Sequence, residues 1–91
     1  MSYQIAVTGH YLKDLKLARK RHLNETLLNE VIKLLAAGEP LPEKNRDHNL
    51  SGNYAGYREC HITPDWLLIY SKDEEIKLVT LTRTGSHSDL F

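Results

Sequence analysis

Two hydrophobic periods follow one another along this chain. Residues 3–7 alternate loosely between apolar and polar positions, which predicts a first strand that ends before Thr8. From residues 10–22 the apolar positions recur every three or four residues, which predicts an amphipathic helix with Thr8 as its N-cap. A second and more apolar helical pattern begins after Asn24 and ends at Gly38. The first part of the chain is therefore a strand followed by a helical hairpin.

The second half returns to strand patterns. Residues 39–46 carry two prolines and predict a surface loop, since proline lacks the N–H that a helix needs. Three strands are expected next, over residues 54–62, 66–70 and 76–83, with residues 86–91 forming a loop or a short helical turn. This order predicts an α+β fold, in which the N-terminal strand and two-helix hairpin precede a mostly antiparallel sheet of three further strands.

Composition narrows the class of protein. A chain of 91 residues predicts one domain over residues 1–91, and its single cysteine cannot form an internal disulfide. No apolar run approaches the roughly 20 residues that span a bilayer, and the polar start lacks a secretion signal. We therefore expect a cytoplasmic protein with no membrane partner.

Charge is balanced but unevenly distributed. The chain has twelve Lys and Arg and twelve Asp and Glu, so its formal net charge is zero. This argues against binding nucleic acid by net charge alone. The predicted first helix nevertheless has a basic stripe of Lys13, Lys16, Arg19 and Lys20, with Asp14 as its one acid. This stripe is either a docking surface for RNA or an ordinary solvated helix face.

Titratable side chains gather at the predicted strand ends. His61 and Asp65 flank one tight turn, and a meander would place Arg83 and the following His87 at the same end of the sheet. His48 precedes the first of these strands, and its loop could reach the same rim. The topology therefore predicts a cluster of three imidazoles, one carboxylate and one guanidinium.

Such a cluster suits cleavage of RNA by its own 2′-hydroxyl. That reaction needs a base for the hydroxyl, an acid for the leaving oxygen and a cation for the phosphorane. Histidine serves as acid or base near neutral pH, and arginine presents a planar fork that matches phosphate. We expect neither a cofactor nor a metal.

Each candidate also has a plainer interpretation. His61 could be a hydrogen-bonded core histidine, Asp65 a turn residue, and Trp66 a core residue rather than a base-stacking surface. Arg58 could form a cross-strand pair without meeting substrate. Cys60 with the three histidines could bind zinc, although their spacing matches no common zinc pattern.

Four motifs follow one another in the second half of the chain: Asp47-His48-x-Leu50-x-Gly52, Gly56-Tyr57-Arg58-x-x-His61, Pro64-Asp65-Trp66 and Arg83-Thr84-Gly85-x-His87-x-x-Leu90-Phe91. In these motifs, and over nearly its whole length, the chain resembles the YafQ branch of the RelE-type bacterial toxins, which are ribosome-dependent mRNA endonucleases. The chain departs from the branch at Asn49, where proline is usual, and at Tyr54, where tryptophan is common.

The resemblance implies specific roles. It implies the catalytic set His48, His61, Asp65, Arg83 and His87, with Phe91 positioning an mRNA base. We assign Trp66 and Arg58 to substrate binding as well. The implied partners are mRNA on the ribosome, ribosomal RNA under the basic stripe, and a ribbon-helix-helix antitoxin. Two alternatives from other classes are a non-catalytic RNA- or ribosome-binding module and a small homodimeric scaffold.

Overall fold

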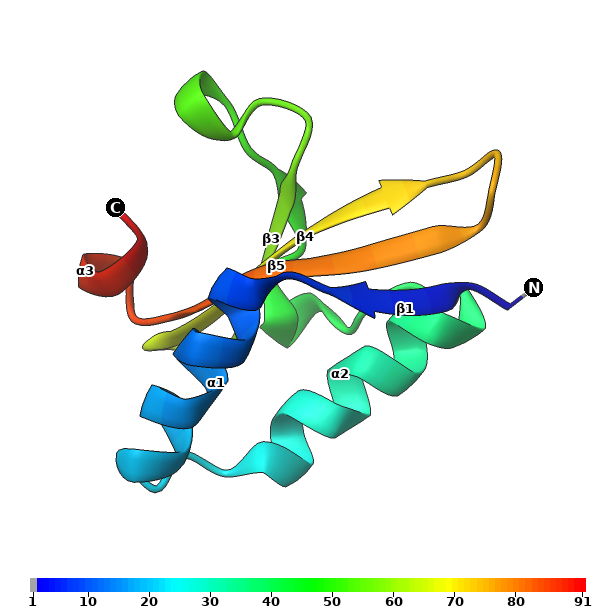
Figure 1. The fold of residues 1–91 in the computed structure, drawn as a ribbon. Coiled ribbons are helices and arrows are strands. Elements are labelled where there is room, and N and C mark those ends of the chain that lie inside the picture. Colours follow the sequence, from blue (N-terminus) through cyan, green and yellow to red (C-terminus); the bar gives the residue numbers. More distant parts are fainter. Residues whose placement is uncertain (1) are drawn as a thin grey trace.

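A five-stranded sheet carries two helices on one side (Figure 1). The structure is a computed structural model that describes residues 2–91. Its strands are β1 (Gln4–Val7), β2 (His48–Asn49), β3 (Arg58–Thr63), β4 (Trp66–Asp73) and β5 (Leu78–Gly85), in the sheet order β1-β5-β4-β3-β2. Only β1 runs parallel to its neighbour, β5, and the other three pairings are antiparallel. The predicted α+β class is confirmed.

The helices begin and end where their capping residues predict. The helix α1 (Gly9–Lys20) starts after Thr8, whose side chain accepts a hydrogen bond from the Tyr11 N–H. Asn24 caps α2 (Glu25–Ala37) in the same way through the N–H of Thr26, and Gly38 ends that helix in the left-handed conformation at φ 72°. Within residues 2–91, neither helix has the length and apolar composition needed to cross a bilayer.

The second half differs from the expected three strands. The strand predicted over residues 54–62 begins only at Arg58, because a 3-10 turn, η2 (Gly52–Tyr54), and Gly56 at φ 92° occupy the preceding segment. The expected loop over residues 39–46 contains a second 3-10 turn, η1 (Glu43–Asn45), and is followed by the two-residue strand β2. The sheet therefore has four strands after the helical hairpin. The C-terminal segment forms the short helix α3 (His87–Leu90), as one of the two expected alternatives.

The sheet has a large core on one side and a small one on the other. On the helix side, Trp66, Leu68 and Tyr70 pack with residues of α1 and α2. On the opposite side, Leu67 and Ile69 pack with Leu90 and a partly buried cover that consists of Leu50, Tyr54 and Tyr57. Both faces of β4 are thus buried, as its continuous apolar run predicts. We call the side opposite α1 and α2 the open face.

Candidate functional site

The strand register brings three of the predicted site positions into two successive rows on the open face of the sheet. One row runs from His48 through Glu59 and Ile69 to Arg83. The next row runs from His61 through Leu67 to Gly85, directly before the segment that carries His87. Because neighbouring strands lie about 4.8 Å apart, the backbones of Glu59 and Arg83 are separated by roughly 10 Å. His48, His61 and Arg83 therefore lie on one face of the sheet, and the convergence of His87 with them stays a prediction.

A β-bulge turns Arg83 toward the open face. Tyr70 pairs with Leu81, whereas the preceding Ile69 pairs with Arg83, so Thr82 is an extra residue on β5. Leu81 points into the core under the helices. In a regular strand Arg83, two residues further on, would point the same way. Instead it shares the face of Ile69. A bulge that redirects a side chain in this way is common beside active sites.

A buried carboxylate lies between two histidines on this face. Glu59 Oε1 is 3.5 Å from His48 Nε2 and 3.8 Å from His61 Nε2. The two imidazole centroids are 6.5 Å apart, and the Glu59 side chain is only 8% exposed. Within residues 2–91, Glu59 Oε2 has no hydrogen-bond partner. Burying a carboxylate with one unpartnered oxygen is costly, which is typical of a group retained for function.

A backbone carbonyl group fixes the orientation of the His48 ring. Its Nδ1 lies 2.6 Å from the Arg46 carbonyl oxygen, which can only accept, so Nδ1 carries the proton. The other nitrogen, Nε2, faces Glu59 and is the one available to take up a proton. The resulting imidazolium would then stand opposite a carboxylate. This arrangement suits a general base.

Arg58 anchors the segment around His48 on the helix side of the sheet. Its guanidinium donates to both oxygens of Asp47, at 3.3 and 3.0 Å, and to Asn49 Oδ1 at 2.6 Å. Tyr70 also donates to Asp47, at 2.6 Å. Arg58 therefore holds the residues before and after His48. The Asn49 side chain supplies a restraint where the resembled toxins usually have proline.

These contacts correct the assignment of Arg58 to substrate binding. The Asp47 carboxylate raises the pKa of Arg58 and occupies its fork, so the arginine acts as a structural clamp. Burial, followed by the hydrogen bond to Asp47, also raises the pKa of Tyr70 well above its usual range. The Tyr70 hydroxyl thus remains a neutral donor in this clamp.

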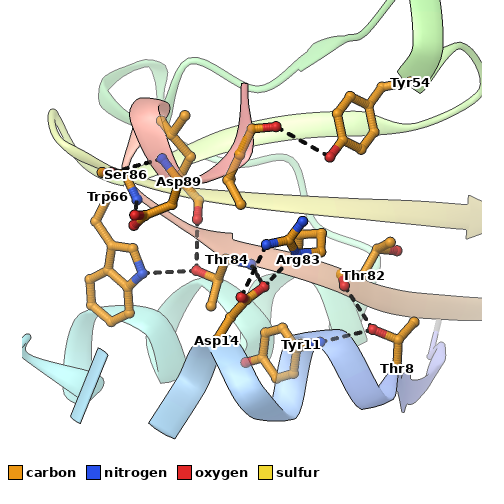
Figure 2. Close-up of polar contacts among 12 residues, drawn as sticks. Thr8, Tyr11, Asp14, Tyr54, Trp66, Thr82, Arg83, Thr84, Ser86 and Asp89 are labelled. Atoms are coloured by element: carbon orange, nitrogen blue, oxygen red, sulfur yellow. Dashed lines mark hydrogen bonds and ion pairs between the residues drawn. The ribbon is translucent and has the colours of Figure 1, made fainter. Parts of the chain in front are cut away.

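Arg83 is held by a carboxylate of α1. Its Nε and Nη2 donate to the two oxygens of Asp14, at 2.7 and 3.2 Å (Figure 2). Hydrogen bonding to Asp14 is the largest cause that raises the pKa of Arg83, and Tyr54 contributes less. The side chains of Arg83 and Asp14 are only 21% and 14% exposed. The remaining amine, Nη1, lies outside the ion pair with Asp14, and Tyr54 also neighbours the guanidinium.

Aromatic rings extend the open face toward the C-terminus. His87 stacks on Phe91 with centroids 4.9 Å apart, and Phe91 meets the edge of Tyr54 at 5.4 Å. Tyr57 packs edge-on against Tyr54 at 6.1 Å. Phe91 is 53% exposed, so its ring is open to a nucleobase.

The amino-acid sequence matches a known family over nearly the whole chain. Residues 3–91 match the family model described as bacterial toxin of type II toxin-antitoxin system, YafQ. This chain belongs to the YafQ family. The mRNA interferase toxin YafQ of Escherichia coli K12 is 44% identical over 88 residues, which cover 96% of this chain and 94% of the relative.

Solved structures show the same fold. The E. coli DinJ–YafQ toxin-antitoxin complex superposes with a TM-score of 0.90 at 42% identity, covering 100% of this chain and 99% of that one. A metal-bound toxin from Helicobacter pylori superposes with a TM-score of 0.91 at 40% identity, covering 100% of both chains. In the present YafQ-family chain, no group of three His, Cys, Asp or Glu within residues 2–91 is arranged to hold a metal ion.

Two predicted site residues lie elsewhere than expected in this YafQ-family structure. Trp66 is 1% exposed under the helices, where its indole N–H donates to Thr84 Oγ1 at 2.8 Å. It is a core residue, which corrects its assignment to substrate binding. Asp65 is exposed in the turn before β4, and within residues 2–91 no hydrogen bond or ion pair joins it to His61. Glu59 occupies the place beside His61 that was predicted for Asp65.

The basic stripe of α1 is reduced by one member. Arg19 is paired with Glu25 at the start of α2. Lys13, Lys16 and Lys20 are exposed and, at 100° per residue, fall within roughly 60° of the helix surface. These three lysines form the face available to a polyanion.

Glu59 was not predicted as a site residue, although the sequence contains a signal for it. Glu59 and His61 are two residues apart on one strand, so both must point to the same face. No comparable signal identified Asp14, because its contact with Arg83 joins positions 69 residues apart.

Proposed function

We propose that this chain is an endoribonuclease that cleaves translating mRNA on the ribosome by attack of the 2′-hydroxyl, without a metal. The observation that carries the proposal is the pair of histidines around buried Glu59, whose own row across the sheet ends at Arg83. The name of the E. coli relative, mRNA interferase toxin YafQ, supports mRNA as the target. His48 and His61 provide the general base, and Glu59 holds the proton-bound imidazole in place.

The remaining roles follow from position. His87, at the start of α3, is the general acid for the 5′-oxygen, and Arg83 stabilises the charge of the phosphorane through its guanidinium. Phe91 positions a base by stacking, supported by Tyr54. Asp65 stays in the proposed set at the rim of the site, where it would meet bound RNA rather than orient His61.

The partners follow from the surface and from the family. Lys13, Lys16 and Lys20 dock on ribosomal RNA, since exposed lysines on one helix face suit a phosphate backbone. An antitoxin neutralises the toxin, as the DinJ complex of the E. coli relative supports, and we expect this antitoxin to have a ribbon-helix-helix fold. The chain acts in the cytoplasm, where ribosomes are found, and takes no membrane partner.

Product chemistry tests the reaction. Purified protein with programmed ribosomes is expected to give a 5′-hydroxyl and a 2′,3′-cyclic phosphate, or the 3′-phosphate that forms from it by hydrolysis. Cleavage should persist after chelation that leaves ribosomes intact, and His87→Ala should remain folded but lose about 100-fold or more in rate. A 5′-phosphate product, or activity that depends on added zinc, would refute the 2′-hydroxyl mechanism.

A further inference from the structure

The first helix contacts the C-terminal part of the site through two ion pairs. The first joins Asp14 to Arg83, and Asp14 Oδ2 also accepts from the Thr84 backbone N–H at 3.1 Å. One α1 carboxylate thus binds both the side chain of Arg83 and the strand edge beside it (Figure 2).

The second ion pair lies about two helical turns further along α1. Arg21, the C-cap of α1, donates to both oxygens of Asp89 in α3, at 2.6 and 3.4 Å. Asp89 also accepts from the Ser86 backbone N–H at 2.9 Å, which completes a capping box at the start of α3. Hydrogen bonding to Arg21 is the largest cause that lowers the pKa of Asp89. Asp89 therefore remains a carboxylate across the pH range in which histidine titrates.

The space between these ion pairs is not filled by apolar packing. A cavity of about 210 Å³ lies between α1 and the end of β5, and all four charged residues of the two pairs line it. Leu90 anchors α3 on the open face, and on the α1 side the Arg21–Asp89 ion pair connects α3 to α1 at this cavity. A short helix of four residues has little stability of its own, so such contacts decide its orientation.

We propose that Asp14 and Arg21 are positioning residues for cleavage, which hold Arg83 and the helix bearing His87 in their reactive arrangement. Asp14 takes two N–H groups of the Arg83 fork and directs the guanidinium to the phosphate. Arg21 sets the orientation of α3 through Asp89. Helix α1 thus serves both docking and chemistry, through different residues. The inference rests on the proposed ribonuclease function.

Asp14→Asn tests the first pair. The amide keeps an oxygen for the Thr84 N–H but presents its NH₂ to the donors of Arg83, so the bidentate hold is lost. We expect the single-turnover rate of ribosome-bound complexes to fall about 10- to 100-fold, with ribosome affinity unchanged. Glu30→Gln, the same chemical change on the exposed part of α2, is the matched control and should retain the wild-type rate.

A double-mutant cycle separates positioning from general stability. In an Arg83→Ala background, Asp14→Asn should produce no further loss, because the group that it positions is gone. Arg21→Gln should likewise lower the rate in the wild type and add no further loss in a His87→Ala background. Asp14→Glu, which keeps the carboxylate, should recover at least part of the rate.

The outcomes distinguish this inference from the proposed function. If the wild type cleaves and Asp14→Asn cleaves equally fast, the positioning role is refuted while the ribonuclease stands. Equal fractional losses in the wild-type and Arg83→Ala backgrounds would also refute it, since they would indicate a structural effect. A wild type that does not cleave would refute the proposed function itself.

Discussion

The substitution Glu59→Gln should change activity and stability in opposite directions. It removes the charge between His48 and His61 while keeping the shape of the side chain. Loss of the carboxylate removes the group that stabilises a proton on either imidazole. It also removes a buried anion with one oxygen that has no partner within residues 2–91.

The magnitude follows from the distances in the structure. A charge pair at 3.5 Å, the separation of Glu59 Oε1 from His48 Nε2, is worth about 5 kcal/mol at an effective dielectric constant of about 20. Because the His48 side chain is 48% exposed, solvent screens the pair. We therefore take about 2 kcal/mol as the stabilisation that Glu59 gives to the protonated imidazole. This energy corresponds to a loss of roughly 30-fold in cleavage rate. The free energy of unfolding should not fall and should rise by up to about 1 kcal/mol, since a neutral amide is easier to bury.

The assay pairs two measurements on one preparation. Single-turnover cleavage on programmed ribosomes gives the rate, and urea unfolding at about pH 8, above the ordinary titration of histidine, gives the stability. Glu75→Gln, in the exposed hairpin turn, is the matched control and should alter neither. A Glu59→Gln variant that cleaves at the wild-type rate but unfolds more easily would show that Glu59 is structural and refute the reasoning.

Two further predictions concern docking and the core. Replacing Lys13, Lys16 and Lys20 with Gln should weaken ribosome binding and reduce the slope of log affinity against log salt by about 2 to 3. The rate of bound complexes should change little, and parallel salt plots of equal height for variant and wild type would contradict a docking role. Thr84→Val leaves the Trp66 indole N–H without its acceptor, which should cost about 2 kcal/mol and lower the melting temperature by roughly 8–16 °C. An unchanged melting temperature would show that the indole finds another partner.

Local chemistry made the first half of the fold predictable. Thr8, Asn24 and Gly38 each perform a capping role that their residue types specify, so the helix boundaries followed within one or two residues. The start of β3 was misplaced because Tyr54 and Tyr57 look like strand residues. Their actual role is to cover Leu67 and Ile69 from a turn, a tertiary packing effect that overrides local preference.

The site was predictable only as far as strand order determined it. His61, Arg83 and His87 were expected at one sheet end because hairpin geometry requires it. Their partners were not, since an ion pair such as Asp14 with Arg83 depends on how α1 docks against the edge of β5. The bulge at Thr82 could not be predicted either, because one extra residue in a strand produces no recognisable change in its alternating pattern.

The pairing of β1 has a consequence for biosynthesis. Gln4 of the first strand is hydrogen-bonded beside Leu78 of the last, so β1 has no sheet partner until most of the chain has been made. Translation proceeds from the N-terminus, and contacts of such long sequence separation form late. Arg83, His87 and Phe91 are likewise added after the residues of β1, α1 and α2. The candidate site therefore cannot assemble on the nascent chain until the residues of β5 and α3 have been made.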